Sequence, residues 1–302
     1  MQQAVSPAGV HDLHLRRQVL PTASRCLVMG VVNVTPDSFS DGGRYLDADA
    51  AVRHGLSLAA AGADLLDVGG ESTRPGAAEV DAATELARVL PVVSRLADAT
   101  PVPVSIDTRK AAVARAALEA GAAVVNDVSA GRHDPELLPV VADAHAGLVL
   151  MHMRGTPATM QDDPCYGDVL AEVGAFLAER AAAAVEAGVA HDAIAVDPGI
   201  GFGKRDEHNY ALLAGLDRLG VSGHPVLVGV SRKAFIGRAL GLGVGERLEG
   251  TAAVVAWAVA HGARIVRVHD VGPLRRVVRM TEALMHGEAP HSAGESRGGP
   301  GG

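Results

Sequence analysis

One pattern repeats along the chain and limits what it can fold into. A short apolar run ends in a polar residue, a loop follows, and the next stretch is Ala-rich and typical of a helix. Apolar runs without alternation predict parallel strands that are buried on both faces. Ala193–Val196 shows this clearly, because the run ends at Asp197 and is then broken by Pro198 and Gly199. About eight such units over about 260 residues predict a single α/β domain, a (β/α)8 TIM barrel.

The expected strands and helices can be placed along the sequence. We predict strands at 26–34, 64–69, 104–107, 122–126, 147–151, 193–197, 226–230 and 264–268. We predict helices at 48–61, 81–98, 110–120, 135–144, 169–187, 209–219, 234–240, 249–261 and 274–286. A doubly wound open sheet is the alternative, which a G-x-G-x-x-G turn after the first strand would favour. The sequence has no such turn there.

Composition narrows the class of protein. The chain has 302 residues, 48% of them hydrophobic, which is enough for one large core. A net charge of −8 without a basic stripe argues against nucleic acid or an anionic membrane as partner. Cys26 and Cys165 are too few for a disulfide framework. With no signal-peptide pattern and no spanning apolar run, we expect a cytoplasmic protein.

The chain divides into three parts. We expect an N-terminal extension or lead-in hairpin at 1–24 and the catalytic barrel at 25–286. The last residues, 287–302, are rich in Gly, Pro and Ser and predict a disordered tail.

Polar residues stand at or just after the ends of most expected strands. In a barrel these ends and the loops after them share one face, where the chemistry lies. The pattern therefore predicts one active site, at the C-terminal face of the strands, from Asn33, Thr73, Asp107, Asn126, His152, Asp197, Lys233, Arg267 and His269.

One half of this set suits a flat heterocycle. Asp107, Asn126 and Asp197 come at strand ends and should lie deep, where carboxylates need hydrogen-bond donors. A 2-amino-4-oxo ring supplies adjacent N–H groups, and a carboxylate can accept two of them in parallel. Lys233 can donate to the oxo group of such a ring.

The other half suits phosphate. Thr73 offers a hydroxyl, and Arg267 and His269 alternate on the last strand and so point to the same side. Asn33 offers a neutral oxygen that can bind Mg²⁺ together with diphosphate oxygens and waters. A heterocycle pocket joined to a diphosphate pocket predicts a transferase that releases diphosphate.

Each of these residues also has a purely structural interpretation. Asp107 could cap a helix, and Asp197 or Asn126 could begin a turn. Lys233 could lie on a solvated helix face. His152 is more typical of a buried, hydrogen-bonded histidine than of a ligand, so we leave it out of the catalytic set. The repetition of polar ends on most strands is harder to explain by caps alone.

The segments around these residues resemble one known family. They are Asn33–Gly43 (NVTPDSFSDGG), Gly69–Gly76 (GGESTRPG), Ser105–Thr108 (SIDT), Asn126–Ser129 (NDVS), Met151–Gly155 (MHMRG), Asp197–Lys204 (DPGIGFGK), Ser231–Lys233 (SRK) and Arg267–Asp270 (RVHD). In this order they resemble the motifs of the dihydropteroate synthases, folate-pathway enzymes that sulfonamides inhibit. The resemblance runs from about Cys26 to about His286.

The resemblance implies a homodimeric (β/α)8 barrel that condenses 6-hydroxymethyl-7,8-dihydropterin diphosphate with 4-aminobenzoate. It implies Mg²⁺ as cofactor, small molecules as its substrates, and the following residue roles. Pterin is held by Asp107, Asn126, Asp197 and Lys233, diphosphate by Thr73, Arg267 and His269, and Mg²⁺ by Asn33. The loops at 35–43 and 71–76 close the site and form the aminobenzoate pocket, with candidates Asp37, Phe39, Arg74 and Pro75.

The family mechanism is dissociative, with Asp37, Lys233 and Arg267 as the residues closest to the chemistry. Asp37 would stabilise the pterinylmethyl cation or the attacking amine. Two positions depart from the family pattern: Gly70 replaces a common Ala, and Ala234 replaces a Ser that can reach the aminobenzoate carboxylate. Ser231 could serve in its place.

Two other functions remain open at this point. A corrinoid-type pterin methyltransferase barrel shares the pterin-reading carboxylates but does not need Thr73, Arg267 and His269. A non-catalytic paralogue that binds pterin would be expected to lose loop or Mg²⁺ residues.

Overall fold

Eight parallel strands close into a barrel in the order β10-β3-β4-β5-β6-β7-β8-β9. The structure is a computed structural model that describes residues 9–34, 44–72, 79–219 and 223–287, without the side chains of 44–47. The barrel strands are β3 (Leu27–Asn33), β4 (Leu65–Gly69), β5 (Val104–Asp107), β6 (Val124–Asp127), β7 (Gly147–Met151), β8 (Ile194–Asp197), β9 (Val226–Gly229) and β10 (Ala263–Val268). The predicted (β/α)8 barrel is confirmed.

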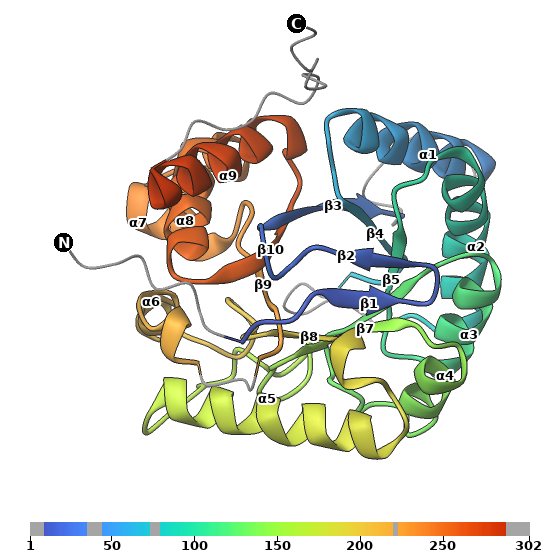
Figure 1. Ribbon diagram of the computed structural model, residues 1–302, viewed down its shortest axis with the longest axis horizontal. Coiled ribbons are helices and arrows are strands. Elements are labelled where there is room, and N and C mark those ends of the chain that lie inside the picture. The colour runs from blue at the N-terminus through green and yellow to red at the C-terminus, as the bar shows by residue number, and fades with distance from the viewer. Residues whose placement is uncertain (1–8, 35–43, 73–78, 220–222, 288–302) are drawn as a thin grey trace, which may run out of the picture.

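Helices form an outer ring around the strands (Figure 1). They are α1 (Arg44–Ala60), α2 (Ala82–Ala99), α3 (Ala111–Glu119), α4 (Leu137–Asp143), α5 (Val169–Glu186), α6 (Asp206–Ala214), α7 (Ala234–Leu240), α8 (Leu248–Ala260) and α9 (Val271–His286). Short 3-10 helices are η2 (His191–Ala193), η3 (Leu216–Arg218) and η4 (Val244–Glu246). No helix among the described residues is long and apolar enough to cross a membrane.

Strand residues alternate between two apolar environments. Leu27, Met29 and Leu65 belong to a cluster inside the barrel. Their neighbours Val28 and Leu66 pack instead in the larger cluster between strands and helices. Because both faces of each strand are buried, the strands read as continuous apolar runs rather than as alternating patterns.

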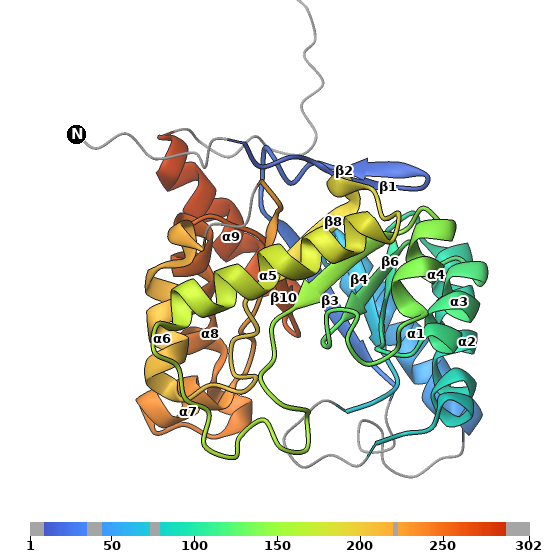
Figure 2. The same ribbon diagram turned by 90° about the horizontal axis from the view of Figure 1, so that it is seen from below.

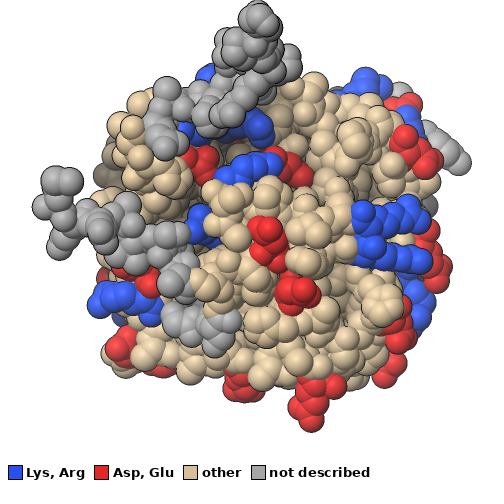
Figure 3. Space-filling model, in the orientation of Figure 1, with Lys and Arg blue, Asp and Glu red and all other residues tan. Residues whose placement is uncertain are grey.

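An antiparallel hairpin closes one end of the barrel. It consists of β1 (Leu13–Leu15) and β2 (Gln18–Leu20), and its leucines join the interior cluster. Figure 2 shows the hairpin at the end opposite the loops that follow the strands. The segment expected as an N-terminal extension therefore includes a hairpin whose apolar side chains cover this end of the barrel interior. Acidic and basic side chains are interspersed over the visible part of this face (Figure 3).

Three helices, α1, α6 and α9, begin three or four residues before their predicted starts, α1 at Arg44 rather than at 48. The helix expected at 209–219 begins at Asp206 and ends at Ala214, and Gly215 separates it from η3. A Cβ at Gly215 would lie 2.5 Å from a terminal methyl of Leu170, so a larger residue here would require the Leu170 side chain to move. The last helix begins at Val271, before Pro273. Proline is tolerated there because first-turn N–H groups have no partner within the helix.

Candidate active site

The inward-facing positions change from apolar to polar along four strands. Leu65 is followed two residues later by Asp67, and Val124 by Asn126. Ala195 is followed in the same way by Asp197, and Ile265 by Arg267. Since residues two apart share one face of a strand, these polar side chains form the next layer above the apolar interior. The strand ends thus converge on one polar site.

Arg267 lies at the centre of this layer. Its Nε donates to Oδ2 of Asp67 at 2.6 Å, and its Nη2 donates to Oδ2 of Asp107 at 2.9 Å. Asn126 Nδ2 donates to the same Asp67 oxygen at 3.1 Å. We call Asp67, Asp107, Asn126 and Arg267 the polar floor. Four strands, β4, β5, β6 and β10, each supply one of its members.

The polar floor has unusual electrostatics. Burial raises the pKa of Asp107 to about 7, although the nearby guanidinium of Arg267 opposes the shift. Burial alone would lower the pKa of Arg267, but Asp67 and Asp107 outweigh it and raise that pKa. Arg267 therefore stays charged, whereas Asp107 titrates near neutral pH and responds to a ligand that donates hydrogen bonds to it.

Asp67 was missed by the sequence analysis, although it is fully buried and touches two of the predicted residues. Its position inside an apolar strand was the available signal, because a charge is costly there without a partner. Oδ1 of Asp67 and Oγ of Ser105 are buried with no hydrogen-bond partner in the described part of the chain. These two residues are register neighbours on β4 and β5.

Asp197 and Lys233 form the adjoining wall. Asp197 ends β8, and its Oδ1 accepts the N–H of Gly199 at 2.7 Å. Burial raises its pKa, against the effect of Lys233. Lys233 precedes α7, donates to the carbonyl of Ile200, and lies 4.3 Å from the Phe202 ring centroid. These contacts leave Lys233 half-buried rather than on a solvated helix face, and burial lowers its pKa to about 8.

Gly199 makes this wall possible. Its φ of 67° lies in the left-handed region, and a Cβ there would stand 1.9 Å from the carbonyl oxygen of His152. Only glycine fits such a close backbone approach. The turn it permits aims its own N–H at Asp197.

Of the residues expected at diphosphate, the structure describes Arg267 on β10 and His269, which follows it directly after the strand. Ser231 Oγ accepts the backbone N–H of His269 at 3.2 Å and lies 3.1 Å from its Nδ1. Asn33 ends β3, and its parity matches that of the inward-facing Leu27 and Met29. The structure thus brings together Asn33, Asp107, Asn126, Asp197, Ser231, Lys233, Arg267 and His269 on the C-terminal ends of the barrel strands and the residues that follow.

Five predicted site residues lie outside the described residues. Asp37 and Phe39 fall in 35–43, and Thr73, Arg74 and Pro75 fall in 73–78. Their roles stay predictions.

A network of buried charged side chains includes Glu71, which lies shortly before the segment 73–78. Lys110 Nζ donates to Oε2 of Glu85 at 2.6 Å and to Glu71. Arg109 Nη2 donates to Oε1 of Glu71 at 3.0 Å and to Oε1 of Glu79 at 2.9 Å. Glu85 is fully buried, and Lys110 and Glu71 are each only 10% exposed. The network fixes Glu71, the second residue after β4, and was not foreseen from the sequence.

His152 is held by a neighbouring lysine. Its Nδ1 lies 2.9 Å from Nζ of the buried Lys204. Burial lowers the pKa of His152 to about 3 and that of Lys204 to about 7. His152 is therefore a neutral imidazole that accepts a hydrogen bond, as a structural histidine does.

The sequence that forms this site also matches a known protein family. The sequence model of the family described as pterin binding enzyme matches residues 29–269. That range reaches from β3 to the end of the site at His269. The chain belongs to the pterin-binding enzymes.

Similarity to individual proteins shows to which pterin-binding enzymes the chain is related. The dihydropteroate synthase of Mycobacterium leprae is 50% identical over 266 residues, which cover 86% of this chain and 93% of the relative. A solved Xanthomonas albilineans dihydropteroate synthase with 4-aminobenzoic acid is 48% identical, with a TM-score of 0.85 and coverage of 91% and 98%. The same organism's enzyme in complex with 7,8-dihydropteroate is 45% identical, with a TM-score of 0.82 and coverage of 90% and 98%. Within the pterin-binding enzymes, this chain belongs to the dihydropteroate synthases.

Proposed function

We propose that the chain transfers a pterinylmethyl group from 6-hydroxymethyl-7,8-dihydropterin diphosphate to 4-aminobenzoate, giving 7,8-dihydropteroate and diphosphate. The observation behind this proposal is the polar floor with its adjoining wall of Asp197 and Lys233. The X. albilineans enzyme structures with 4-aminobenzoic acid and with 7,8-dihydropteroate support the same pair of ligands by similarity.

The polar groups match the edge of a pterin. Asp107 and Asp197 can accept from the amino and ring N–H groups, and Asn126 can both donate and accept. A ligand that donates to buried carboxylates offsets their desolvation. Lys233, next to Asp197, can donate to the oxo group. The arrangement selects a flat ring with a donor-rich edge.

The first chemical step is loss of diphosphate. The bond between the exocyclic CH₂ and the diphosphate oxygen breaks, and its electron pair leaves on diphosphate. Arg267 and His269, at the end of β10, can stabilise that charge, with Ser231 holding His269 in place. The carboxylates at the ring edge, when ionised, favour the cation that remains.

The second step is attack by the amine. The lone pair of 4-aminobenzoate forms the new C–N bond, and the nitrogen then loses a proton to solvent or diphosphate. An aromatic amine is nucleophilic without a strong base, so the site needs mainly to position it and to exclude water. Asp37, Phe39, Arg74 and Pro75 are the residues we propose for that role, with Asp37 close to the cation.

Asn33 fits a Mg²⁺ site shared with the substrate. It offers a neutral oxygen at the site end of β3, and Mg²⁺ in phosphate sites takes few protein ligands. Bound there, Mg²⁺ would neutralise charge on the diphosphate. We expect Asn33→Ala to raise the Mg²⁺ concentration for half-maximal rate by roughly tenfold, because a charge-assisted contact is lost. An unchanged Mg²⁺ dependence would remove Asn33 from this role.

Asp197→Asn tests pterin recognition. We expect kcat/KM for the pterin diphosphate to fall roughly 10–100-fold, because a neutral amide replaces a charged acceptor. Asp192→Asn is the matched control, since Asp192 is only half-buried, lies in η2 before the other end of β8, and should leave the rate unchanged. Equal kcat/KM in both variants would contradict pterin binding at Asp197.

Binding of the dihydropterin should depend on pH. A protonated Asp107 turns one of its oxygens into a donor, so this carboxyl, with a pKa of about 7, accepts two parallel N–H bonds only when ionised, and affinity should rise as the pH passes 7. Lys233, with a pKa of about 8, loses its charge above that pH, so affinity should then fall. A fluorescence titration from pH 5.5 to 9.5 measures both limbs. Lys233→Arg should move only the alkaline limb, and a flat profile would overturn the assignment.

The other functions fit less well. A corrinoid-type methyltransferase has no need of His269 beside Arg267, and a non-catalytic paralogue has no need of Asn33. Both remain distinguishable by turnover. A homodimeric assembly and a cytoplasmic location stay predictions.

A further inference from the structure

Three histidines converge at the end of the barrel opposite the active site. One nitrogen from each of His11, His191 and His224 lies within 4.8 Å of the other two. His11 precedes β1, His191 begins η2, and His224 precedes β9. Ring centroids are 5.2 Å apart for His11 and His191, and 4.3 Å apart for His191 and His224. We call these residues the histidine cluster.

Backbone contacts join the segments that carry the histidine cluster, and Nε2 of His11 lies 3.4 Å from Nδ1 of His224. The N–H of His11 donates to the carbonyl of Gly223 at 3.2 Å, and Thr22 Oγ donates to the carbonyl of His11 at 2.8 Å. His224 is only 4% exposed. The segments before β1 and β9 are therefore already joined, and the rings are preorganised.

Two of the rings have one nitrogen set by a backbone carbonyl. His11 Nδ1 lies 3.0 Å from the oxygen of Asp12, and His224 Nδ1 lies 3.2 Å from the oxygen of Ile194. A carbonyl can only accept, so Nδ1 carries the proton and Nε2 keeps a lone pair. The lone pair of His11 Nε2 faces Nδ1 of His224 at 3.4 Å, a contact that a bound ion would replace. Metal-binding histidines usually have this second contact, which fixes the ring and raises its basicity.

The cluster also offers a suitable ligand type and one open side. His224 is buried, with the rings of His11 and His191 packed against it. His191 is exposed, which leaves room for a water ligand. Neutral imidazoles suit Zn²⁺ and related transition metals, whereas Mg²⁺ prefers oxygen ligands.

We propose that His11, His191 and His224 bind a divalent transition metal of the Zn²⁺ type, with water as a fourth ligand. The ion would tie the segments before β1, β8 and β9 together under the barrel. Its role would be structural, because the active-site residues lie at the opposite end.

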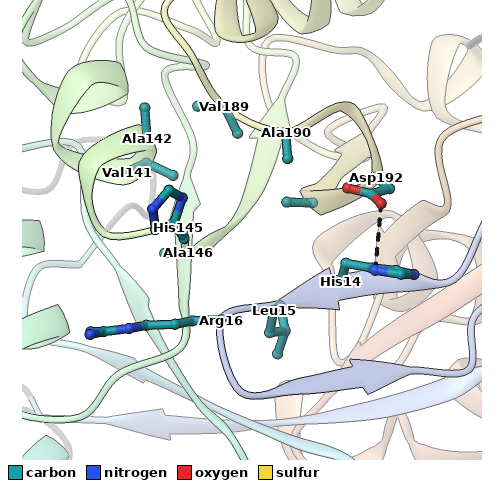
Figure 4. Close-up of a pocket in the computed structure, with 11 residues that line it drawn as sticks. His14, Leu15, Arg16, Val141, Ala142, His145, Ala146, Val189, Ala190 and Asp192 are labelled. Carbon is teal, nitrogen blue, oxygen red and sulfur yellow. Dashed lines mark ion pairs between the residues drawn. The ribbon is translucent and has the colours of Figure 1, made fainter.

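A nearby histidine supplies the control. His14 lies on β1 beside a pocket of about 160 Å³, where its Nδ1 is 3.5 Å from Oδ2 of Asp192 (Figure 4). Its side chain is 51% exposed, and it is not one of the three clustered residues. His14→Ala therefore removes a histidine from the same hairpin without touching the cluster.

The test uses full-length protein stripped with a chelator, in excess Mg²⁺. Calorimetry with Zn²⁺ and absorption spectra with Co²⁺ should show one ion per chain. Thermal unfolding at about a hundredfold excess over Kd should show a Tm rise of roughly 4 °C. His191→Ala should weaken binding more than about tenfold and abolish the Tm rise, whereas His14→Ala should behave as wild type.

His191 is exposed, so the metal-free Tm of His191→Ala should match that of wild type and separate ligand loss from misfolding. Equal Zn²⁺ affinity in wild type and His191→Ala would overturn the proposal. So would equal weakening in His14→Ala, or the absence of a Co²⁺ spectrum at millimolar metal.

Discussion

Replacing Arg267 with alanine should destabilise the protein by about 3–5 kcal/mol and remove most of its activity. The guanidinium donates to both Asp67 and Asp107, and Asp67 is fully buried. Without it, two neighbouring carboxylates face each other with no cation between them in the polar floor. Urea unfolding gives the free energy, and kcat/KM for the pterin diphosphate gives the catalytic loss.

Two further variants make this result specific. Arg95→Ala removes an exposed ion pair with Asp49 and should cost less than about 1 kcal/mol. Arg267→Lys keeps the charge but not the planar fork, so it should recover part of the stability and little of the rate. A loss in Arg267→Ala no larger than in Arg95→Ala would show that the polar floor does not need its cation.

Replacing Lys110 with methionine should have an effect of similar size, about 3–5 kcal/mol of unfolding free energy. Lys110 is nearly buried and bridges Glu71 and the fully buried Glu85. Methionine keeps the length of the side chain but leaves the Glu85 charge without its cation. Thermal and urea unfolding measure the loss.

A double variant tests the cause. Glu85→Gln removes the charge that Lys110 neutralises, so Lys110→Met with Glu85→Gln should be more stable than Lys110→Met alone. Lys110→Arg should stay closest to wild type. If Lys110→Met unfolds at the wild-type midpoint, the network does not stabilise the segment after β4.

The barrel could be predicted because its signals are local. A strand buried on both faces produces an unbroken apolar run, as at Gly147–Met151, and each run ends where its chain leaves the sheet. Helix limits shifted by a few residues where the deciding feature was not local, as at Gly215, whose missing Cβ makes room for Leu170.

Much of the candidate site could be predicted for the same reason. A polar residue at the C-terminal end of a strand, such as Asp107 or Asn126, lies on the active-site face of a barrel, so its place on that face can be predicted from the sequence. The partner of Asp67 could not be identified from the sequence, because Arg267 is 200 positions away and only the closed barrel joins the two residues. Lys110 and Glu85 were likewise unrecognised, since both sit on segments that read as ordinary amphipathic helices.

The central claim is tested most directly by turnover. Purified protein is mixed with the pterin diphosphate, 4-aminobenzoate and Mg²⁺, and dihydropteroate and diphosphate are both measured. Equal, Mg²⁺-dependent formation of the two products is the predicted result. Diphosphate without dihydropteroate would mean that the pterin half works with a different acceptor. Tight dihydropterin binding with neither product formed would contradict the synthase assignment and favour a non-catalytic pterin-binding protein.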